Sequence, residues 1–265
     1  MGQQPVVERR DAPLILSMPH VGLGVPESVR GQLTAHALEL EDTDWWIDRL
    51  YDFGEELGAT VIRATVSRYV IDVNRDPSGA SLYPGQATTE LCPTTNFDGV
   101  PLYRDGAGPS AGEIEGQRLP YHTAYHDALA AEIRRLRDRH PRIVLYDCHS
   151  IRSVVPRLFD GELPVFNIGT NGGVSCAPEV EAIVTGACAA ADGHSHVVNG
   201  RFRGGWITRH YGDPGAGVHA VQMELAQCAY LTEESPPWSY DPAKAERLRA
   251  VLKPMLRRLV SWAAA

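Results

Sequence analysis

The sequence predicts an α/β fold, in which helices pack on a sheet of buried strands. Short apolar runs rich in β-forming residues indicate core strands at residues 14–18, 143–146 and 218–225. A segment that opens at Asp241 repeats its apolar residues at helical spacing and closes near Trp262, so we expect a helix that packs on the sheet. Polar residues directly follow the run at 143–146, where α/β sheets commonly place their chemistry.

The composition is that of an ordinary globular protein. The chain has 265 residues, of which 43% are hydrophobic and 22% charged, and its formal net charge is -8. An acidic surface argues against nucleic acid as the main partner, because phosphate binding needs clustered Lys and Arg. There is no internal repeat, low-complexity tract or linker, so we expect residues 1–265 to form a single domain.

The sequence also indicates a compartment. No apolar run is long enough to cross a bilayer, and residues 1–13 lack an apolar signal core, so we expect a cytoplasmic protein with no membrane partner. The five cysteines include no CxxC pair, which argues against a disulfide framework or a zinc knuckle. Cys148 lies nearest the suspected chemistry, and we interpret it as a buried thiol.

Two of the predicted strands are each followed by a histidine. His20 comes shortly after the run at 14–18, and His149 belongs to the polar group DCHS, residues 147–150. A lone histidine is usually a surface or capping residue. Two histidines that each end a core strand favour a pair of metal ligands.

Residues 34–57 are predicted to be mainly helical, with an acidic interruption at 41–44. Such a cluster is most often a solvated face or a helix N-cap. Trp45 and Trp46 suggest that Asp44 is partly buried, and a buried carboxylate needs a cation or a metal ion as its partner.

The segment SRYVIDVNRDP, residues 67–77, alternates between apolar and charged residues. Residues 59–66 and 69–73 have β-like composition. Arginine and aspartate at the end of a buried strand form either a structural ion pair or a site for an anionic ligand, and the sequence leaves both open.

Residues 78–108 are predicted to form a long loop. A loop of this length in a compact domain is usually a lid, a binding loop or a linker. Its aromatic residues, Tyr83, Phe97 and Tyr103, favour an ordered binding loop.

A capping box at Ser110–Glu113 predicts the start of a helix that continues, with an interruption at Pro120, to about Arg139. Its expected buried residues are Tyr125, Leu129, Ile133 and Leu136.

The second half of the chain adds predicted strands at 163–168 and 197–198 and an Ala-rich helix at 178–191. Residues 199–212, NGRFRGGWITRHYG, then combine glycines that permit close backbone approach with arginines that offer forked donors to a carboxylate. These arginines are Arg201, Arg203 and Arg209. The alternative is a hairpin with exposed arginines.

Glu224 interrupts the apolar strand at 218–225. A glutamate in this position is either a paired buried acid or one tuned for proton transfer. Together with His20, Asp44 and His149 it forms a chemically coherent set, because two imidazoles and a carboxylate can hold a catalytic zinc ion and a nearby glutamate can act as general base. The ligands are far apart in sequence, so spacing alone gives only a weak signal.

Five segments occur in a characteristic order along the chain. They are PHVGLGVP, DTDWWIDRLYDFG, SRYVIDVNRDP, DCHS and NGRFRGGWITRHYGDPGAGVHAVQMEL. Together they resemble the N-formylglutamate amidohydrolases, or deformylases, of histidine degradation, from about Pro13 to Leu231. The resemblance implies hydrolysis of N-formyl-L-glutamate to formate and L-glutamate. It also implies an α/β fold with a mixed, mostly parallel sheet flanked by helices, similar to that of the zinc-dependent carboxypeptidases.

The resemblance further implies one divalent metal ion, with zinc as the first expectation. His20, Asp44 and His149 would be its ligands and Glu224 the general base; Glu41 and Asp42 lie close enough in sequence to compete with Asp44. The substrate carries two carboxylates and calls for cations and polar donors. The candidates are Arg68, Asn74, Arg75, Arg203, Gly205 and Arg209.

Three other functions stay open at this point. A metal-free hydrolase could use Ser150 or Cys148 as nucleophile, although DCHS lacks the G-x-S-x-G pattern of an exposed nucleophile turn. A non-catalytic binding protein for acidic amino acids would need the arginines alone. A deformylase or deacylase of another acidic N-acyl amino acid would keep the same chemistry. The sequence does not specify the metal, the oligomeric state or closure of the 78–108 loop.

Overall fold

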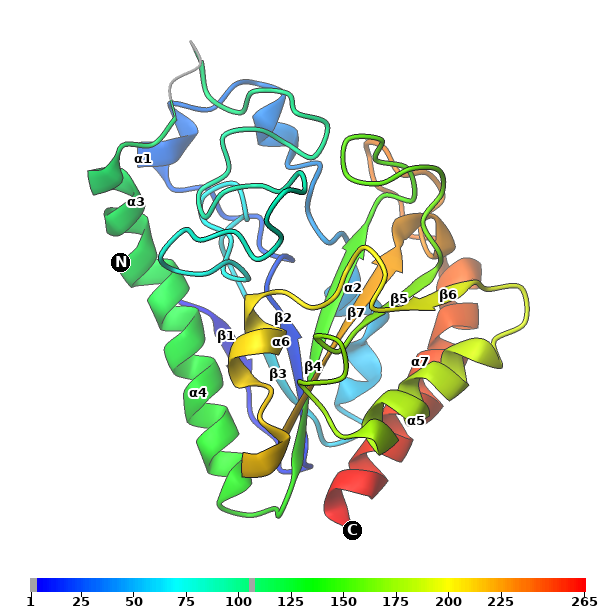
Figure 1. Ribbon diagram of the computed structural model, residues 1–265. Coiled ribbons are helices and arrows are strands. Elements are labelled where there is room, and N and C mark those ends of the chain that lie inside the picture. The colour runs from blue at the N-terminus through cyan, green and yellow to red at the C-terminus, as the bar shows by residue number, and fades with distance from the viewer. Residues whose placement is uncertain (1–3, 105–107) are drawn as a thin grey trace.

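A seven-stranded mixed sheet forms the centre of the molecule in a computed structural model that describes residues 4–104 and 108–265 (Figure 1). Across the sheet the strands are β1 (Val6–Glu8), β3 (Thr60–Arg63), β2 (Leu14–Met18), β4 (Ile143–Ile151), β7 (Val218–Ala226), β5 (Phe166–Gly169) and β6 (His196–Val198). Strands β3, β2, β4 and β7 run parallel, whereas β1 and β5 are antiparallel to their inner neighbours and β6 is parallel to β5. The predicted mixed, mostly parallel sheet is therefore confirmed.

Helices cover both faces of this sheet (Figure 1). One face carries α4 (Ala124–Arg137) and α6 (Trp206–Tyr211). The other carries α2 (Ile47–Leu50), α5 (Pro178–Ala189) and α7 (Pro242–Ala264). The shorter helices are α1 (Glu27–Arg30), α3 (Ala111–Gln117), the π-helical turn Arg118–Thr123, and the 3-10 turns Ala37–Glu39, Asp52–Gly54, Pro214–Ala216 and Gln227–Ala229. Within the described residues, no helix combines the length and apolar character that a membrane span requires.

The strand period of two divides the core into two layers. In β2, Leu14, Leu16 and Met18 face the layer of α5 and α7, while Ile15 faces α4. Strand β4 follows the same rule. Its even-numbered residues 144, 146 and 148 face α7, and its odd-numbered residues 143 and 145 face the α4 layer. The odd-numbered positions further along β4 supply the candidate site.

Several predicted elements are confirmed closely. Strand β2 has the predicted bounds, and β7 is one residue longer than expected. Helix α7 begins after the N-cap Asp241, whose carboxylate accepts hydrogen bonds from the amides of Ala243 and Lys244. The capping box at Ser110 is present, and Pro120 lies in the π-helical turn between α3 and α4, where its missing N–H is tolerated.

The prediction of a mainly helical segment at 34–57 is wrong. Leu40 and Trp46 both adopt left-handed backbone conformations, with φ of 53° and 59°, and each interrupts the helical run. Only α2 and two 3-10 turns form there. The β-like run at 69–73 forms turns instead of a strand.

Two further boundaries differ from the prediction. Strand β4 does not end at Tyr146 but continues to Ile151, so the DCHS residues lie inside a buried strand. Residues 206–211 form helix α6 instead of part of a hairpin. The described residues of the 78–108 loop are ordered around buried Phe97 and Tyr103, as their aromatic character suggested.

Candidate active site

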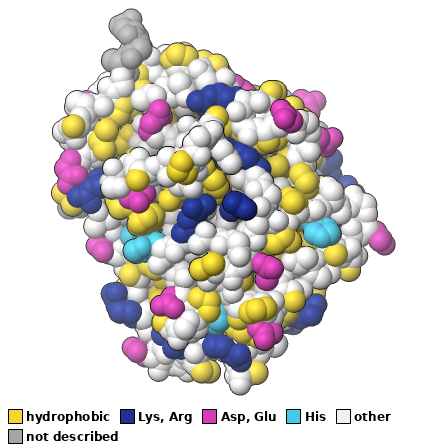
Figure 2. All heavy atoms as spheres, in the orientation of Figure 1, with side chains coloured by type: hydrophobic (Ala, Val, Ile, Leu, Met, Phe, Trp, Pro, Cys, Tyr) yellow, Lys and Arg dark blue, Asp and Glu magenta, His cyan; other side chains and the backbone are white. Residues whose placement is uncertain are grey.

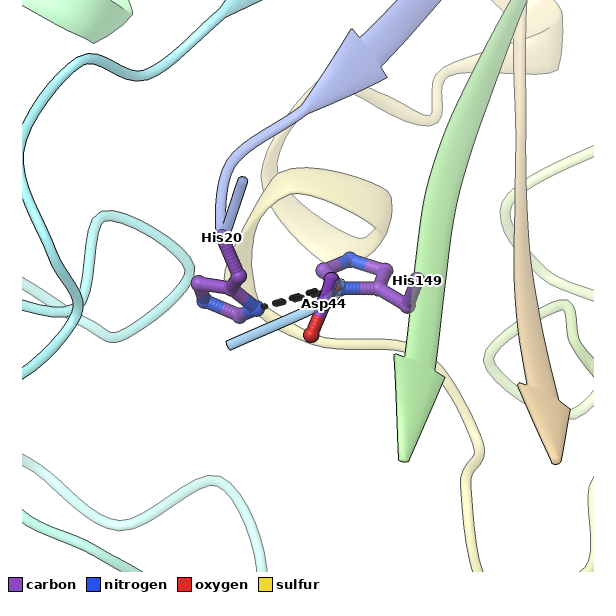
Figure 3. Close-up of side chains that lie close together, drawn as sticks. All are labelled: His20, Asp44 and His149. Atoms are coloured by element: carbon purple, nitrogen blue, oxygen red, sulfur yellow. Dashed lines mark hydrogen bonds and ion pairs between the residues drawn. The ribbon is translucent and has the colours of Figure 1, made fainter. Parts of the chain in front are cut away.

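Three buried side chains from separate segments converge at the carboxyl end of the central strands (Figure 3). His20 follows β2, Asp44 precedes α2, and His149 belongs to β4. The Nδ1 atom of His149 lies 3.1 Å from His20 Nδ1 and 3.1 Å from Asp44 Oδ2, and His20 Nδ1 lies 3.5 Å from the same oxygen. The predicted ligand trio is thus brought together.

The far nitrogen of each imidazole contacts a second carboxylate. His20 Nε2 donates to Asp72 Oδ1 at 2.7 Å, and His149 Nε2 donates to Asp147 Oδ2 at 2.9 Å. This pairing fixes the ring orientation and leaves both Nδ1 atoms facing Asp44, as in many metal-binding histidines.

The converging atoms require a shared positive charge. Burial disfavours ionised Asp44, but the two histidines lower its pKa to about 2, so its carboxylate keeps its charge. Burial likewise disfavours charged His149, yet the carboxylates of Asp147 and Asp44 raise its pKa well above the usual value. Asp44 Oδ1 is buried without a hydrogen-bond partner. Either a proton or a metal ion can supply the missing charge.

The spacing of the three atoms suits a metal ion. A tetrahedral zinc ion with bonds of about 2.0–2.1 Å holds its ligand atoms about 3.3–3.4 Å apart. The observed separations of 3.1, 3.1 and 3.5 Å bracket this value. Two nitrogens and one carboxylate oxygen also form the ligand set of catalytic zinc sites, so the residues present fit the ion that the sequence predicted.

Strand pairing explains the arrangement around His149. Asp147 and His149 are two residues apart in β4 and therefore lie on one face of the sheet. In the parallel register, Ser17 pairs with Asp147 and donates to its Oδ1 at 2.8 Å, while Glu224 of β7 pairs with His149. Gln222, two residues before Glu224, lies on the same face.

Glu224 is a buried acid with a perturbed proton affinity. Burial, together with the negative charge of Asp44, raises its pKa to about 7 against the opposing effect of His149. Gln222 Nε2 donates to Glu224 Oε2 at 3.1 Å and orients the carboxylate. A carboxylate that titrates near neutrality beside a candidate metal centre has the properties of a general base.

A cavity that is partly open to solvent joins these groups. Four of the predicted substrate-binding residues line it together with His20, His149 and Glu224. They are Arg68, Asn74, Arg75 and Gly205. Tyr83, Thr89 and Phe97 from the 78–108 loop complete one wall. Figure 2 shows Lys and Arg side chains near the middle of the face onto which this loop folds in Figure 1.

Arg68 is held rigidly beside the trio. Its Nη2 lies 2.8 Å from Asp72 Oδ2, its Nη1 lies 3.8 Å from Asp44 Oδ1, and its guanidinium stacks over the ring of Phe97. Arg75 makes a longer contact with Asp72 at 3.7 Å and donates to the backbone and hydroxyl oxygens of Thr89. Arg68 therefore forms a structural ion pair with Asp72 and also lines the cavity. The two interpretations of this segment, an ion pair and an anion-binding site, are compatible.

The remaining predicted residues lie elsewhere. Arg203 is exposed, Arg209 donates to Gly204 O and Leu82 O, and both line a neighbouring pocket, so their role in substrate binding stays a prediction. Asp42 accepts a hydrogen bond from the amide of Phe97, and Glu41 contacts Asn96 and His36. Neither joins the two histidines, so the geometry favours Asp44 as the third ligand.

Sequence reasoning gave no site role to three groups and did not rank a fourth above its neighbours. Gln222 and Asp147 each lie two residues before a predicted functional residue, so the strand period of two could have identified them. The segment around Asp72 predicts either an ion pair or a site for an anionic ligand, but not the contact of Asp72 with His20. Arg201 lines the cavity, but its spacing gave no reason to prefer it over Arg203 and Arg209.

Comparisons with known proteins agree on one family. A model of the family described as N-formylglutamate amidohydrolase matches residues 12–231. An N-formylglutamate deformylase of Pseudomonas aeruginosa is 51% identical over 255 residues, covering 96% of this chain and 95% of the relative. An N-formylglutamate deformylase of Pseudomonas putida is 49% identical over 252 residues, covering 95% of this chain and 94% of the relative.

Solved structures show the same fold. The crystal structure of N-formylglutamate amidohydrolase from Ralstonia eutropha superimposes with a TM-score of 0.81 at 22% identity, over 98% of both chains. A gene product of Agrobacterium tumefaciens gives a TM-score of 0.72 at 16% identity, over 99% of this chain and 95% of that one. The likeness to carboxypeptidases stays a prediction.

Two histidines of the helical segment behind the cavity hold the turn that carries Asn74. His122 Nε2 donates to Arg75 O at 2.9 Å, and His126 Nε2 donates to Val73 O at 2.8 Å. Asn74 lies between these carbonyls, and its Nδ2 is 3.0 Å from His149 Nε2. This support keeps Asn74 against the ligand cluster.

His126 should weaken the folded state as the pH falls. Burial, reinforced by the neighbouring His122, lowers the pKa of His126 to about 3, whereas an exposed histidine titrates near 6.5. Between about pH 3 and 6.5 the unfolded chain therefore binds a proton that the folded protein excludes. The stability gained from neutral His126 is complete above about pH 6.5 and is lost progressively below it.

Urea unfolding of wild type and His126→Gln at pH 7.5 and pH 4.5 checks this prediction. The variant lacks the titrating group, so its deficit in unfolding free energy should shrink at pH 4.5. His196→Gln, which alters an exposed histidine, should show no such change. An equal His126→Gln deficit at both pH values would contradict the prediction.

Proposed function

Because this chain belongs to the N-formylglutamate amidohydrolase family, we propose that it hydrolyses N-formyl-L-glutamate to formate and L-glutamate. One observation carries the proposal: His20 and His149, which converge on the buried Asp44, line a cavity together with Glu224 and several guanidinium groups. The two Pseudomonas relatives, about half identical over nearly their whole length, carry the name of this activity. The proposal includes the role in histidine degradation that the sequence resemblance implies.

We also propose that His20 Nδ1, His149 Nδ1 and Asp44 Oδ2 hold one divalent ion, zinc in the first instance. When bound, such an ion supplies Lewis acidity toward the formyl carbonyl and lowers the pKa of water. Asp72 and Asp147 keep both imidazoles aimed at the shared centre.

Glu224 moves the protons of the reaction. Its carboxylate takes a proton from the attacking water as the water oxygen bonds to the formyl carbon. The same group then delivers that proton to the nitrogen as the carbon–nitrogen bond breaks, which yields formate and the free amino group. A pKa near 7 suits both transfers, because the group must accept and release a proton at neutral pH.

The cationic residues bind and orient the substrate. Arg68, fixed between Asp72 and Phe97, places positive charge beside the ligand cluster, where the formyl oxygen gains negative charge. Arg75 is less tightly paired and can form charge-assisted hydrogen bonds to a substrate carboxylate. The Asn74 amide and the Gly205 backbone add polar contacts on the same wall.

The orientation of Cys148 and Ser150 disfavours a metal-free nucleophilic mechanism. Both are even-numbered residues of β4 and lie on the face opposite His149. Cys148 is fully buried in the α7 layer, and burial raises its thiol pKa well above the usual value. Ser150 Oγ accepts hydrogen bonds from Tyr230 and Gln227. Neither residue lines the cavity.

Replacing the general base should remove most of the activity. We expect Glu224→Gln to lower kcat by about 10²–10⁴-fold, the usual contribution of a positioned acid–base group, with metal content unchanged. Formate release measured at saturating substrate gives the comparison. Glu246→Gln, at an exposed position of α7, is the control; near-wild-type turnover of Glu224→Gln would remove the base assignment.

Metal removal should abolish formate release. Purified protein is dialysed against a chelator and assayed with N-formyl-L-glutamate, N-formyl-L-aspartate and N-acetyl-L-glutamate, with elemental analysis of the same samples. We expect activity on N-formyl-L-glutamate to fall with metal content and to return with about one equivalent of Zn²⁺. Full activity of the metal-free protein would refute the metal proposal, and faster turnover of another substrate would correct the substrate.

A further inference from the structure

Arg201 differs from the other arginines of the cavity in its lack of an acidic partner. Arg68 and Arg75 both contact Asp72. Within the described part of the chain, no carboxylate forms an ion pair with Arg201. Its Nε and Nη2 instead donate to two backbone carbonyls, Leu158 O at 2.7 Å and Ala87 O at 2.8 Å.

The surroundings of Arg201 make its charge costly without an anion. The side chain is half-buried, and its guanidinium carbon lies 5.5 Å from the ring centre of Tyr83 and 5.4 Å from that of Phe202. Burial and the positive charge of Arg75 together lower its pKa, against the opposing effects of Tyr83 and Glu224. Removal of a cation from water without a counter-ion is unfavourable, and a bound carboxylate would compensate it.

Arg201 lines the cavity without contacting the three residues of the ligand cluster. Arg68 directly contacts Asp44 and Asp72 at the cluster end. Arg201 is held instead by the carbonyls of Ala87 and Leu158, which line the same cavity. The cavity therefore has cationic groups paired with the acids of the cluster and a further one, Arg201, that is not paired with them.

The substrate has a matching polarity. In N-formyl-L-glutamate the α-carboxylate is attached to the carbon that bears the formamide nitrogen, whereas the side-chain carboxylate lies at the far end of the molecule. With the formyl group at the ligand cluster, the α-carboxylate stays near Arg68 and Arg75. The side-chain carboxylate, at the far end of the molecule, is then left for a cation that is not paired with the acids of the cluster, as Arg201 is.

We propose that Arg201 is the specificity-determining residue that binds the side-chain carboxylate of the substrate. This inference rests on the proposed deformylase function and adds the residue that distinguishes an acidic side chain from its neutral amide. The rings of Tyr83 and Phe202 lie near the guanidinium, whose planar donors can form forked hydrogen bonds to a carboxylate.

A comparison of charged and neutral substrates tests this role. The kcat/KM for N-formyl-L-glutamate and for N-formyl-L-glutamine is measured in wild type, Arg201→Gln, Arg201→Lys and Arg137→Gln. Arg137 is the matched control, since it also donates to two backbone carbonyls but lies where α4 ends, near Gly217.

The expected result is a change in substrate preference. Wild type should prefer N-formyl-L-glutamate, and Arg201→Gln should reduce that preference roughly 10- to 100-fold, the range of a hydrogen bond to a charged group. The loss should appear mainly in KM for the charged substrate. Arg201→Lys should retain part of the preference, because it keeps the charge but loses the fork. Arg137→Gln should leave the preference unchanged.

Other outcomes overturn the inference in distinguishable ways. Equal losses on both substrates would make Arg201 a tether for the surrounding loops or a ligand of the α-carboxylate. If Arg201→Gln does not fold, Arg201→Lys decides, and an unchanged preference in that variant refutes the assignment. Failure of wild type to release formate from either substrate would instead overturn the proposed function itself.

Discussion

The structure depends on a cluster of buried negative charge that requires one shared cation. Asp44 points directly at the two histidines, while Asp72 and Asp147 hold their outer nitrogens. Buried carboxylates are stable only when paired, and Arg68 compensates only part of this charge. A metal ion between the two Nδ1 atoms and Asp44 would satisfy the remainder. These buried carboxylates contribute nothing evident to the packing of the core. Their position suits the binding and activation of a polar substrate.

The sheet makes this arrangement possible because two neighbouring strands, β4 and β7, each place two side chains on the same face. Parallel pairing of β4 with β7 sets Asp147 beside Gln222 and His149 beside Glu224. The candidate ligand His149, the carboxylate that orients it, the proposed general base Glu224 and the hydrogen-bond donor Gln222 therefore share one face of the sheet. Loops contribute what the sheet cannot: Asp44, the arginines and the aromatic wall all come from irregular segments. A precise reacting centre and a more adaptable binding wall follow from this division.

Much of this organisation could be predicted from the sequence, because the spacing of apolar residues indicates which side chains are buried. The apolar strands, the capped helix α7 and the strand-associated histidines follow from local patterns and are confirmed in the structure. The structure of residues 34–57 could not be predicted from periodicity. Leu40 and Trp46 interrupt the helical pattern with left-handed backbone conformations, and nothing in their side chains indicates such a conformation. The continuation of β4 through its polar residues depends on partners supplied by distant segments. For the same reason Arg201 could not be separated from Arg203, because long-range packing alone decides which of the two faces the cavity.

The central claim is best tested by a crystal structure of the protein with added zinc, in which anomalous scattering locates the ion. The account predicts one ion bound by His20 Nδ1, His149 Nδ1 and a carboxylate oxygen of Asp44, with bonds of about 2.0–2.2 Å. An ion held by other residues, or no ion at this position at saturating zinc, would contradict it.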